Sequence, residues 1–380
     1  MKNKKTINVD SVKRVVVKVG SNVLTQADGL NLKAVRSLSS QICYLIDQGM
    51  EILFVSSGAM AAGIKKLGLP GRPDEIPERQ AVAAVGQAGL MMEYEKAFKQ
   101  HDKKVAQILL TGDGLHNRKR YLNARNTFHT LLSWKVVPII NENDTVSVEE
   151  IKFGDNDNLA AMITLLMNAD ILISLTDIEG LYTKDPRTNP DAELIPVVSA
   201  IRKDIEKLAG DIPGELGTGG MLSKIKAARK VTTAGVPMII AKGEYPDILI
   251  KLFSGEEHGT FFVPKKEKMA NRKRWIGFTA KPKGLIRIDD GAAAAVLKRG
   301  KSLLPSGITG VEGEFGVGAP VEFKNGDNEV LGTGLVNYSS TDIRKIMGLK
   351  SGEIADHLGC KPYDEVIHRD NLTITGECDE

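Results

Sequence analysis

The run Gly154-Asp155-Asn156-Asp157-Asn158 brings two carboxylates and two amides together within five residues. Asparagine and aspartate are favoured at the first positions of helices, so one of them could serve only as an N-cap. Near lysines, two carboxylates have a further use, because a buried aspartate can hold two cations against their mutual repulsion. The run therefore predicts either a polar helix start or the organising centre of a site that handles negative charge.

Two lysines occupy positions that a phosphate-binding role would account for. Lys18 interrupts the apolar run Val15–Val19, where an ammonium group is costly unless it is paired or meets a ligand. Lys224 ends the run 217–224 (GTGGMLSK), a glycine-dense loop that leads into a predicted helix. Such a loop lets backbone N–H groups approach an anion at a helix N-terminus. The structural alternatives are a lysine at a strand edge and a flexible loop with a chance lysine.

These residues must be positioned by the elements around them. Apolar runs alternate with helical patterns from residue 15 to residue 241, which predicts an α/β fold with a mostly parallel sheet covered by helices on both faces. The expected strands are 15–19, 52–55, 105–109, 136–140, 171–175 and 237–241. The expected helices are 32–48, 78–100, 118–133, 156–167 and 219–234.

Polar residues and glycines follow four of the expected strands. They are Lys18 with Gly20-Ser21, Ser56-Ser57-Gly58, Asn141-Glu142-Asn143-Asp144, and Thr176-Asp177. Parallel sheets bind ligands at the carboxyl ends of their strands. Strand ends are commonly polar turns, yet four such ends on one edge favour a ligand site.

The character of the chain changes near residue 264. Residues 264–274 are basic and poor in apolar side chains, as in a linker, and short strand patterns follow at 284–288, 310–315, 320–323 and 330–337. One helix is expected among them, at 291–299. We therefore expect a larger domain over 12–263, a linker over 264–274 and a small β-rich domain over 275–368.

Composition narrows the class of protein further. The 380 residues carry a net charge of +3, which is too small to indicate nucleic-acid binding by itself. Three scattered cysteines form neither a disulfide framework nor a CxxC metal site, and the start of the chain lacks a secretion signal. We therefore expect a cytoplasmic protein. Neither GxxxxGK[ST] nor a GxGxxG after a strand occurs, which disfavours P-loop and standard dinucleotide enzymes.

Taken together, several runs match one family. They are Val17-Lys18-Val19-Gly20-Ser21, Val55-Ser56-Ser57-Gly58-Ala59, Asn141-Glu142-Asn143-Asp144, 154–158, Leu175-Thr176-Asp177, Gly180-Leu181-Tyr182-Thr183, Asp185-Pro186-Arg187, 217–224, Asp290-Gly291-Ala292 and 301–308. From about Val15 to His368 the chain resembles the glutamate 5-kinase family, which combines the amino acid kinase fold, a three-layer sandwich, with a C-terminal PUA domain. Lys18 and the glycine-lysine loop are shared across the superfamily. The runs 141–144 and 154–158, joined to a PUA module, are the specific part.

The resemblance implies roles for individual residues. Lys18 and Lys224 neutralise the phosphoryl group in transfer, Asp157 holds both lysines, and Asp155 lies close to the chemistry. The residues implied for glutamate are Ser57, Asp144 and Asn156. The residues implied for ATP are Lys18, Thr176, Asp177, Thr218, Gly219, Gly220, Met221, Leu222, Ser223 and Lys224. Mg²⁺ is expected on the ATP phosphates, without an assigned protein ligand.

The resemblance also implies a reaction and its control. ATP would phosphorylate the side-chain carboxylate of L-glutamate to γ-glutamyl 5-phosphate, the first step of proline biosynthesis. Proline would inhibit by competing around the glutamate site, with 75–87 as a candidate gate, and the chain would form a dimer or tetramer.

Two alternatives stay open on the residues alone. Acetylglutamate kinase, aspartokinase and uridylate kinase share the fold, Lys18 and the glycine loop, but need other residues for their acceptors. An RNA-binding protein that uses the PUA module is the alternative of another class, with the basic residues 265–274 in its favour.

Overall fold

The computed structural model describes residues 12–26, 29–146, 156–210, 220–265 and 269–375. The chain divides into two compact units. The first consists of Met1–Leu115 and Lys119–Lys268, and the second of His116–Arg118 and Met269–Glu380. The expected linker, 264–274, thus contains the end of the first unit and the first residues of the helix α12 (Asn271–Phe278).

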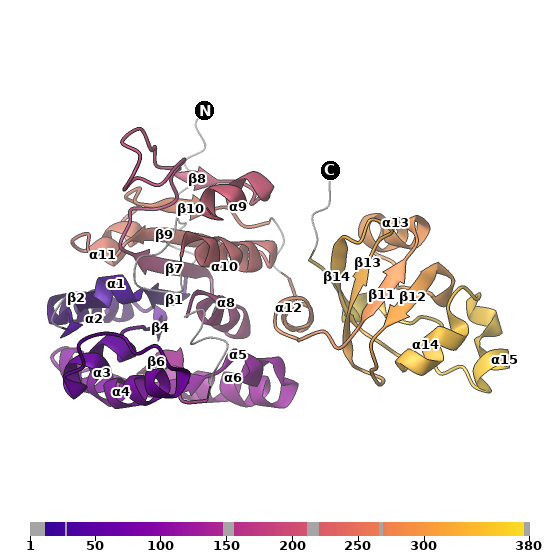
Figure 1. Cartoon of the computed structure of the whole chain (residues 1–380), viewed down its shortest axis with the longest axis horizontal. Coiled ribbons are helices and arrows are strands. Elements are labelled where there is room, and N and C mark those ends of the chain that lie inside the picture. The colour runs from indigo at the N-terminus through magenta and orange to yellow at the C-terminus, as the bar shows by residue number, and fades with distance from the viewer. Residues whose placement is uncertain (1–11, 27–28, 147–155, 211–219, 266–268, 376–380) are drawn as a thin grey trace. The chain divides into compact units, whose positions relative to one another are not determined.

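A mostly parallel sheet forms the centre of the first unit (Figure 1). In spatial order its described strands are β5 (Lys104–Leu110), β6 (Val136–Glu142), β4 (Glu51–Val55), β1 (Arg14–Val19), β7 (Ile171–Thr176), β9 (Met238–Lys242), β10 (Thr260–Phe262) and β8 (Val197–Val198). The strands from β5 to β9 are parallel, and β10 runs antiparallel to β9. The predicted fold class is confirmed, and each strand expected in this part is present.

Helices cover both faces of this sheet. On one face, α2 (Leu32–Asp47), α4 (Ile76–Lys99) and α11 (Ile248–Phe253) share a buried core with Val15, Val17 and Val19 of β1. On the other face lie α8 (Asn156–Leu166) and α10 (Met221–Thr233), which contact each other. Side chains of a strand alternate between the faces, so a strand buried on both faces is apolar throughout, as the buried part of β1 from Val15 to Val19 is except at Lys18.

Other elements complete the first unit, with His116 and Arg118 of the two adjoining helices grouped with the second unit. They are α1 (Ser21–Leu24), the β2–β3 pair (Thr25–Gln26 and Gly29–Leu30), α3 (Ala59–Leu67), α5 (Gly112–His116), α6 (Arg118–Ser133) and α9 (Lys203–Gly210). The sequence did not predict α3, which follows β4 directly.

Two glycines set the close crossing of α3 and α4. A Cβ on Gly86 would lie 1.8 Å from the carbonyl oxygen of Ala59, and one on Gly63 would lie 1.9 Å from that of Val82. Only glycine lets the two backbones approach this far. The first half of α4, around Val82 and Gly86, is thereby held against α3, which begins directly after Ser57-Gly58.

The second unit is a separate β-rich module. Its described sheet has the order β12 (Ile308–Glu312), β11 (Leu285–Ile288), β13 (Pro320–Lys324), β14 (Val330–Leu335) and β15 (Leu372–Ile374). Helix α13 (Asp290–Arg299) was expected, whereas α12, α14 (Ser340–Ile346), α15 (Ile354–Leu358) and β15 were not. Ile286, Val321 and Phe323 belong to a core of its own. Across the described residues of both units, no helix is long and apolar enough to cross a membrane.

Candidate active site

The carboxyl ends of the central strands meet at one edge of the sheet. In the register of the sheet, Lys18 of β1 lies between Val55 of β4 and Ser174 of β7. Gly20, two residues after Lys18, donates its backbone N–H to the carbonyl of Leu175, and Ser56 donates its backbone N–H to the carbonyl of Ile140. The polar residues that follow β1, β4, β6 and β7 are therefore neighbours in space.

Asp157 lies between Lys18 and Lys224. Its Oδ1 is 2.6 Å from Lys18 Nζ, and its Oδ2 is 3.3 Å from Lys224 Nζ. All three residues are at most 4% exposed. Two cations and one anion leave this buried cluster with an excess positive charge, which suits an anionic ligand.

Opposing effects act on the charge of Asp157. Burial alone would raise the pKa of this carboxyl, but Lys18, Lys224 and the hydrogen bonds from Lys18 and Ser223 outweigh it and hold the pKa well below its usual range. Ser223 Oγ lies 2.7 Å from Oδ2, and Ser174 Oγ lies 3.4 Å from Oδ1. Asp157 is thus ionised at any pH near neutrality and serves as a fixed negative charge.

Two helix starts bring this cluster together. Asp157 is the second residue of α8, and Lys224 lies in the first turn of α10, which begins after Gly220. Gly220 is the extended N-cap residue of α10, and its carbonyl oxygen lies 2.8 Å from Ser223 Oγ. The N-terminus of α10 adds a partial positive charge beside Lys224.

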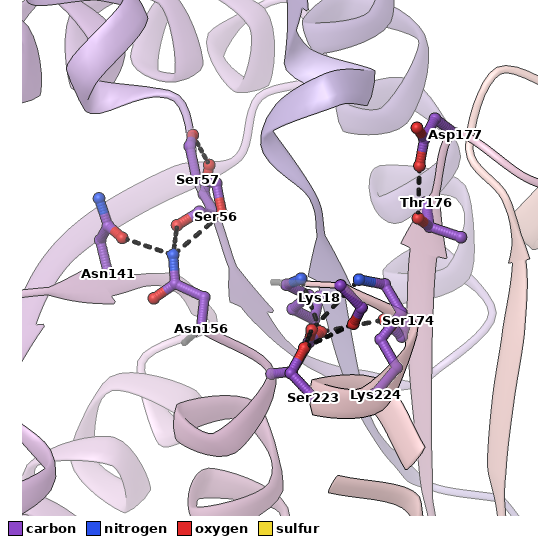
Figure 2. Close-up of polar contacts among 12 residues, drawn as sticks. Lys18, Ser56, Ser57, Asn141, Asn156, Ser174, Thr176, Asp177, Ser223 and Lys224 are labelled. Carbon is purple, nitrogen blue, oxygen red and sulfur yellow. Dashed lines mark hydrogen bonds and ion pairs between the residues drawn. The ribbon is translucent and has the colours of Figure 1, made fainter. Parts of the chain in front are cut away.

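A second cluster, the amide network, lies around Asn156, the first residue of α8. Asn156 Nδ2 approaches three acceptors within 3.2 Å: the carbonyl of Ser56, Oγ of Ser57 and Oδ1 of Asn141 (Figure 2). Asn141 in turn donates from Nδ2 to Gln87 Oε1 on α4 at 2.8 Å. The other end of the Asn156 amide, Oδ1, is buried and has no hydrogen-bond partner in the described structure.

A third group follows β7. Thr176 Oγ1 donates to Asp177 Oδ1 at 2.8 Å, and Asn22 Nδ2 donates to Asp177 Oδ2 at 2.9 Å. Partial burial raises the pKa of Asp177, but these bonds, its own backbone N–H and the charge of Lys224 lower it overall. Asp177 therefore stays an acceptor for ligand donors at this edge of the sheet.

Asp144 lies in the turn after β6, three residues beyond Asn141. Its charge acts on Arg72 in the segment between α3 and α4. Partial burial and the neighbouring Arg79 lower the pKa of Arg72, and Asp144 acts in the opposite direction. Arg79, which belongs to the 75–87 region, and Asp144 therefore both lie within electrostatic range of Arg72.

Some predicted residues fall outside the described ranges. They are Asp155, Thr218 and Gly219. The remaining ATP-loop residues, from Gly220 to Lys224, are described and form the start of α10.

Known proteins resemble the chain over both units. The model of the amino acid kinase family matches residues 13–242, and that of the PUA domain matches 284–358. The glutamate 5-kinase of Syntrophus aciditrophicus is 50% identical over 364 residues, which cover 96% of this chain and 94% of that protein. The glutamate 5-kinase of Geobacter sulfurreducens is 51% identical over 367 residues, which cover 96% of this chain and 98% of that protein. The chain belongs to the glutamate 5-kinase family.

Within this member of the glutamate 5-kinase family, sequence reasoning missed three residues of the site. Ser174 faces Asp157, Asn22 binds Asp177, and Gln87 binds Asn141. Ser174 had a usable signal, since it interrupts an apolar strand as Lys18 does. No feature of the sequence pointed to the bond between Gln87 and Asn141, because only the packing of α4 brings the two residues together.

The described residues of this family member also bear on metal binding. They contain no group of three or more His, Cys, Asp or Glu side chains that could hold a metal ion. A divalent cation that arrives on ATP can be held by phosphate oxygens and water, since Mg²⁺ commonly keeps several waters.

Proposed function

We propose that this chain transfers the γ-phosphoryl group of ATP to the side-chain carboxylate of L-glutamate and so forms γ-glutamyl 5-phosphate, the first step of proline biosynthesis. The observation that carries this proposal is Asp157 between Lys18 and Lys224, beside the amide network around Asn156. The first cluster provides positive charge for a phosphoryl group, and the second provides polar groups for an amino acid.

The reaction needs little covalent help from the protein. A carboxylate oxygen of glutamate forms a bond to the γ-phosphorus of ATP, the bond to the β,γ-bridging oxygen breaks, and ADP leaves. Glutamate has a side-chain pKa near 4.3 and is already ionised at neutral pH, so no general base is required. Catalysis then consists of in-line positioning and charge stabilisation.

Lys18 and Lys224 would supply that charge stabilisation. Phosphoryl transfer spreads negative charge over the equatorial oxygens of the transferred group, and two ammonium groups aimed at it stabilise the transition state. Asp157 keeps the lysines together and oriented while no phosphate is bound. It is an organiser and not a base, because its pKa is held far below neutrality.

The amide network would recognise glutamate. Asn156 Oδ1 is a buried acceptor without a partner, which costs roughly 1–3 kcal/mol unless a ligand supplies a donor. Among the groups of glutamate only the α-ammonium carries donors at neutral pH. Ser57 Oγ, held at 2.9 Å from Asn156, and Asp144 complete the proposed glutamate site.

ATP would bind across β7 and the start of α10. The proposed ATP residues in the described part are Lys18, Thr176, Asp177, Gly220, Met221, Leu222, Ser223 and Lys224, and Thr218 and Gly219 complete them. Mg²⁺ on the phosphates would supply further neutralisation of charge. Asp155 is proposed to lie close to the chemistry.

An acceptor screen tests the proposal. Purified protein with ATP and MgCl₂ is given glutamate, acetylglutamate, aspartate or UMP, and ADP release is measured. We expect fast release with glutamate and at most a small fraction of that rate with the others. Fast release with acetylglutamate, aspartate or UMP and none with glutamate would assign the chain to another kinase of this fold.

Proline inhibition, an oligomeric state of two or four chains and a cytoplasmic location remain predictions. If proline competes around the glutamate site, raising glutamate at fixed proline should restore the rate of ADP release. Inhibition that glutamate cannot relieve would move the proline site elsewhere.

A further inference from the structure

Gln87 is a buried polar residue that the proposed reaction does not yet use. It lies on the inner face of α4, is 9% exposed, and its Oε1 accepts a hydrogen bond from Asn141 Nδ2 at 2.8 Å. Asn141 in turn accepts from Asn156 Nδ2 at 3.0 Å. Gln87 is therefore two hydrogen bonds away from the acceptor proposed to bind glutamate.

Two backbone groups and the side chain of Gln87 together hold the direction of this chain of amides. The N–H of Glu142 can only donate, and it donates to Asn141 Oδ1 at 2.9 Å. Asn141 Nδ2 must then face Gln87, which has to present its oxygen. At the other end, the carbonyl of Ser56 can only accept, so Asn156 presents Nδ2 to it and to Asn141. Each amide thus has one orientation that satisfies its neighbours.

The orientation of these amides decides which atom of the Asn156 side chain faces a bound ligand. With Nδ2 committed to Ser56, Ser57 and Asn141, Asn156 turns its oxygen toward an incoming donor. If Asn141 turned over, its Nδ2 would face Asn156 Nδ2, and Asn156 would gain by turning as well. It would then present an N–H to the ammonium group of the substrate and repel it.

We propose that Gln87 is a positioning residue that, through Asn141, keeps the Asn156 amide oriented for the α-ammonium group of the acceptor. The inference rests on the proposed function, since it names what Asn156 Oδ1 binds. Gln87 touches Asn141 and not the reacting atoms, so its effect falls on recognition of the acceptor.

The fold explains how a helix residue reaches this place. Gly86, the neighbour of Gln87, lies against the backbone of Ala59, where any Cβ would be 1.8 Å from the carbonyl oxygen. Ala59 begins α3 two residues after Ser57. The glycine contact therefore holds Gln87 at a fixed distance from the end of β4 and the amide network.

The test compares two glutamines. Gln87→Met keeps the length of the side chain and removes the acceptor. Gln41→Met is the matched control, because Gln41 of α2 is also buried and its Oε1 accepts a hydrogen bond at 2.9 Å from the backbone N–H of Leu249 on α11. Gln87→Glu restores an acceptor for Asn141.

We expect Gln87→Met to lower kcat/KM for glutamate at least tenfold, with KM for ATP within twofold of the unmodified protein. Gln41→Met should leave both constants within twofold, and Gln87→Glu should recover most of the loss. In an Asn156→Ala background, Gln87→Met should cause no further loss, because the residue through which it acts is gone.

Substrate selectivity gives a second readout. Glutarate lacks the ammonium group, so the ratio of kcat/KM for glutamate to that for glutarate should fall in Gln87→Met and stay constant in Gln41→Met. Equal effects of the two methionine variants, or full additivity with Asn156→Ala, would overturn the inference while leaving the proposed function intact. Absence of glutamate phosphorylation by the unmodified protein would instead overturn the proposed function.

Discussion

A single carboxylate sets the electrostatics of the site. Asp157 is buried between two lysines, and the three side chains have a net charge of +1 before any ligand binds. Buried charges are stable only when they are paired, so the lysines depend on Asp157 and it depends on them. In the proposed reaction, a phosphoryl group would bring negative charge to this cluster.

Lys224→Met should separate catalysis from binding. Removing one ammonium group aimed at the transferring phosphoryl group should lower kcat by about 10² to 10³, because its charge matters most in the transition state. KM for glutamate should change far less. The control is Lys226→Met, two residues further along the same helix and exposed, which should be neutral. Near-normal kcat for Lys224→Met would remove this lysine from the catalytic residues.

The pH dependence of stability should carry the signature of Asp157. The pKa of this carboxyl is lowered in the folded protein, so its stabilising contribution is complete above its ordinary value of about 3.9 and is lost as the pH falls through the folded pKa. Asp157→Asn removes the carboxylate from between two buried lysines and should cost about 3–5 kcal/mol at pH 7.

Urea unfolding of the unmodified protein and of Asp157→Asn measures this contribution. The difference in unfolding free energy should be constant from pH 6 to pH 8 and should shrink only in strong acid. A difference that titrates near neutrality would mean that the pKa of Asp157 is raised and not lowered.

At the scale of elements, the crossing of α3 and α4 positions one side of the site. Gly86→Ala would place a methyl group against the carbonyl oxygen of Ala59, and overpacking of this kind costs about 1–3 kcal/mol. Because α4 also carries Gln87, activity with glutamate should fall as well. Gly89→Ala is the control, since a Cβ there meets no neighbouring atom within 4 Å in the described structure.

Thermal unfolding and glutamate-dependent ADP release of both variants check this prediction. Gly89→Ala should be neutral or stabilising by up to about 1 kcal/mol, because alanine favours the helix. Equal stability of the two variants would show that the helices can move apart without cost.

The elements of the sheet could be predicted from sequence because their strands are continuous apolar runs. The helix α3 was missed because it is short, rich in small residues and follows directly on a polar strand end. In the second unit, α12 begins among basic residues, yet Trp275 and Ile276 are buried, which composition alone does not reveal.

Part of the site, the residues at the strand ends, could be predicted because the order of strands and helices places them together. Residues that follow parallel strands must meet at one edge, so Lys18, Ser57 and Thr176 were found from topology. Residues that reach the site from a helix face, such as Gln87, depend on how that helix packs. The spacing of residues along the chain does not fix that packing.

At the scale of the whole molecule, the chain consists of two units, each with its own buried core. Lys18, Asp157, Lys224 and the described residues of the amide network all belong to the first unit, which therefore carries the proposed chemistry. The second unit matches the PUA domain and has its own buried core.

Chemical trapping of the product tests the central claim most directly. Hydroxylamine converts an acyl phosphate into a hydroxamate, so the full chain is incubated with ATP, MgCl₂, glutamate and hydroxylamine. γ-Glutamyl hydroxamate and ADP should form at equal rates, and both should require glutamate. ADP release in the presence of glutamate without any hydroxamate would contradict phosphorylation of the side-chain carboxylate.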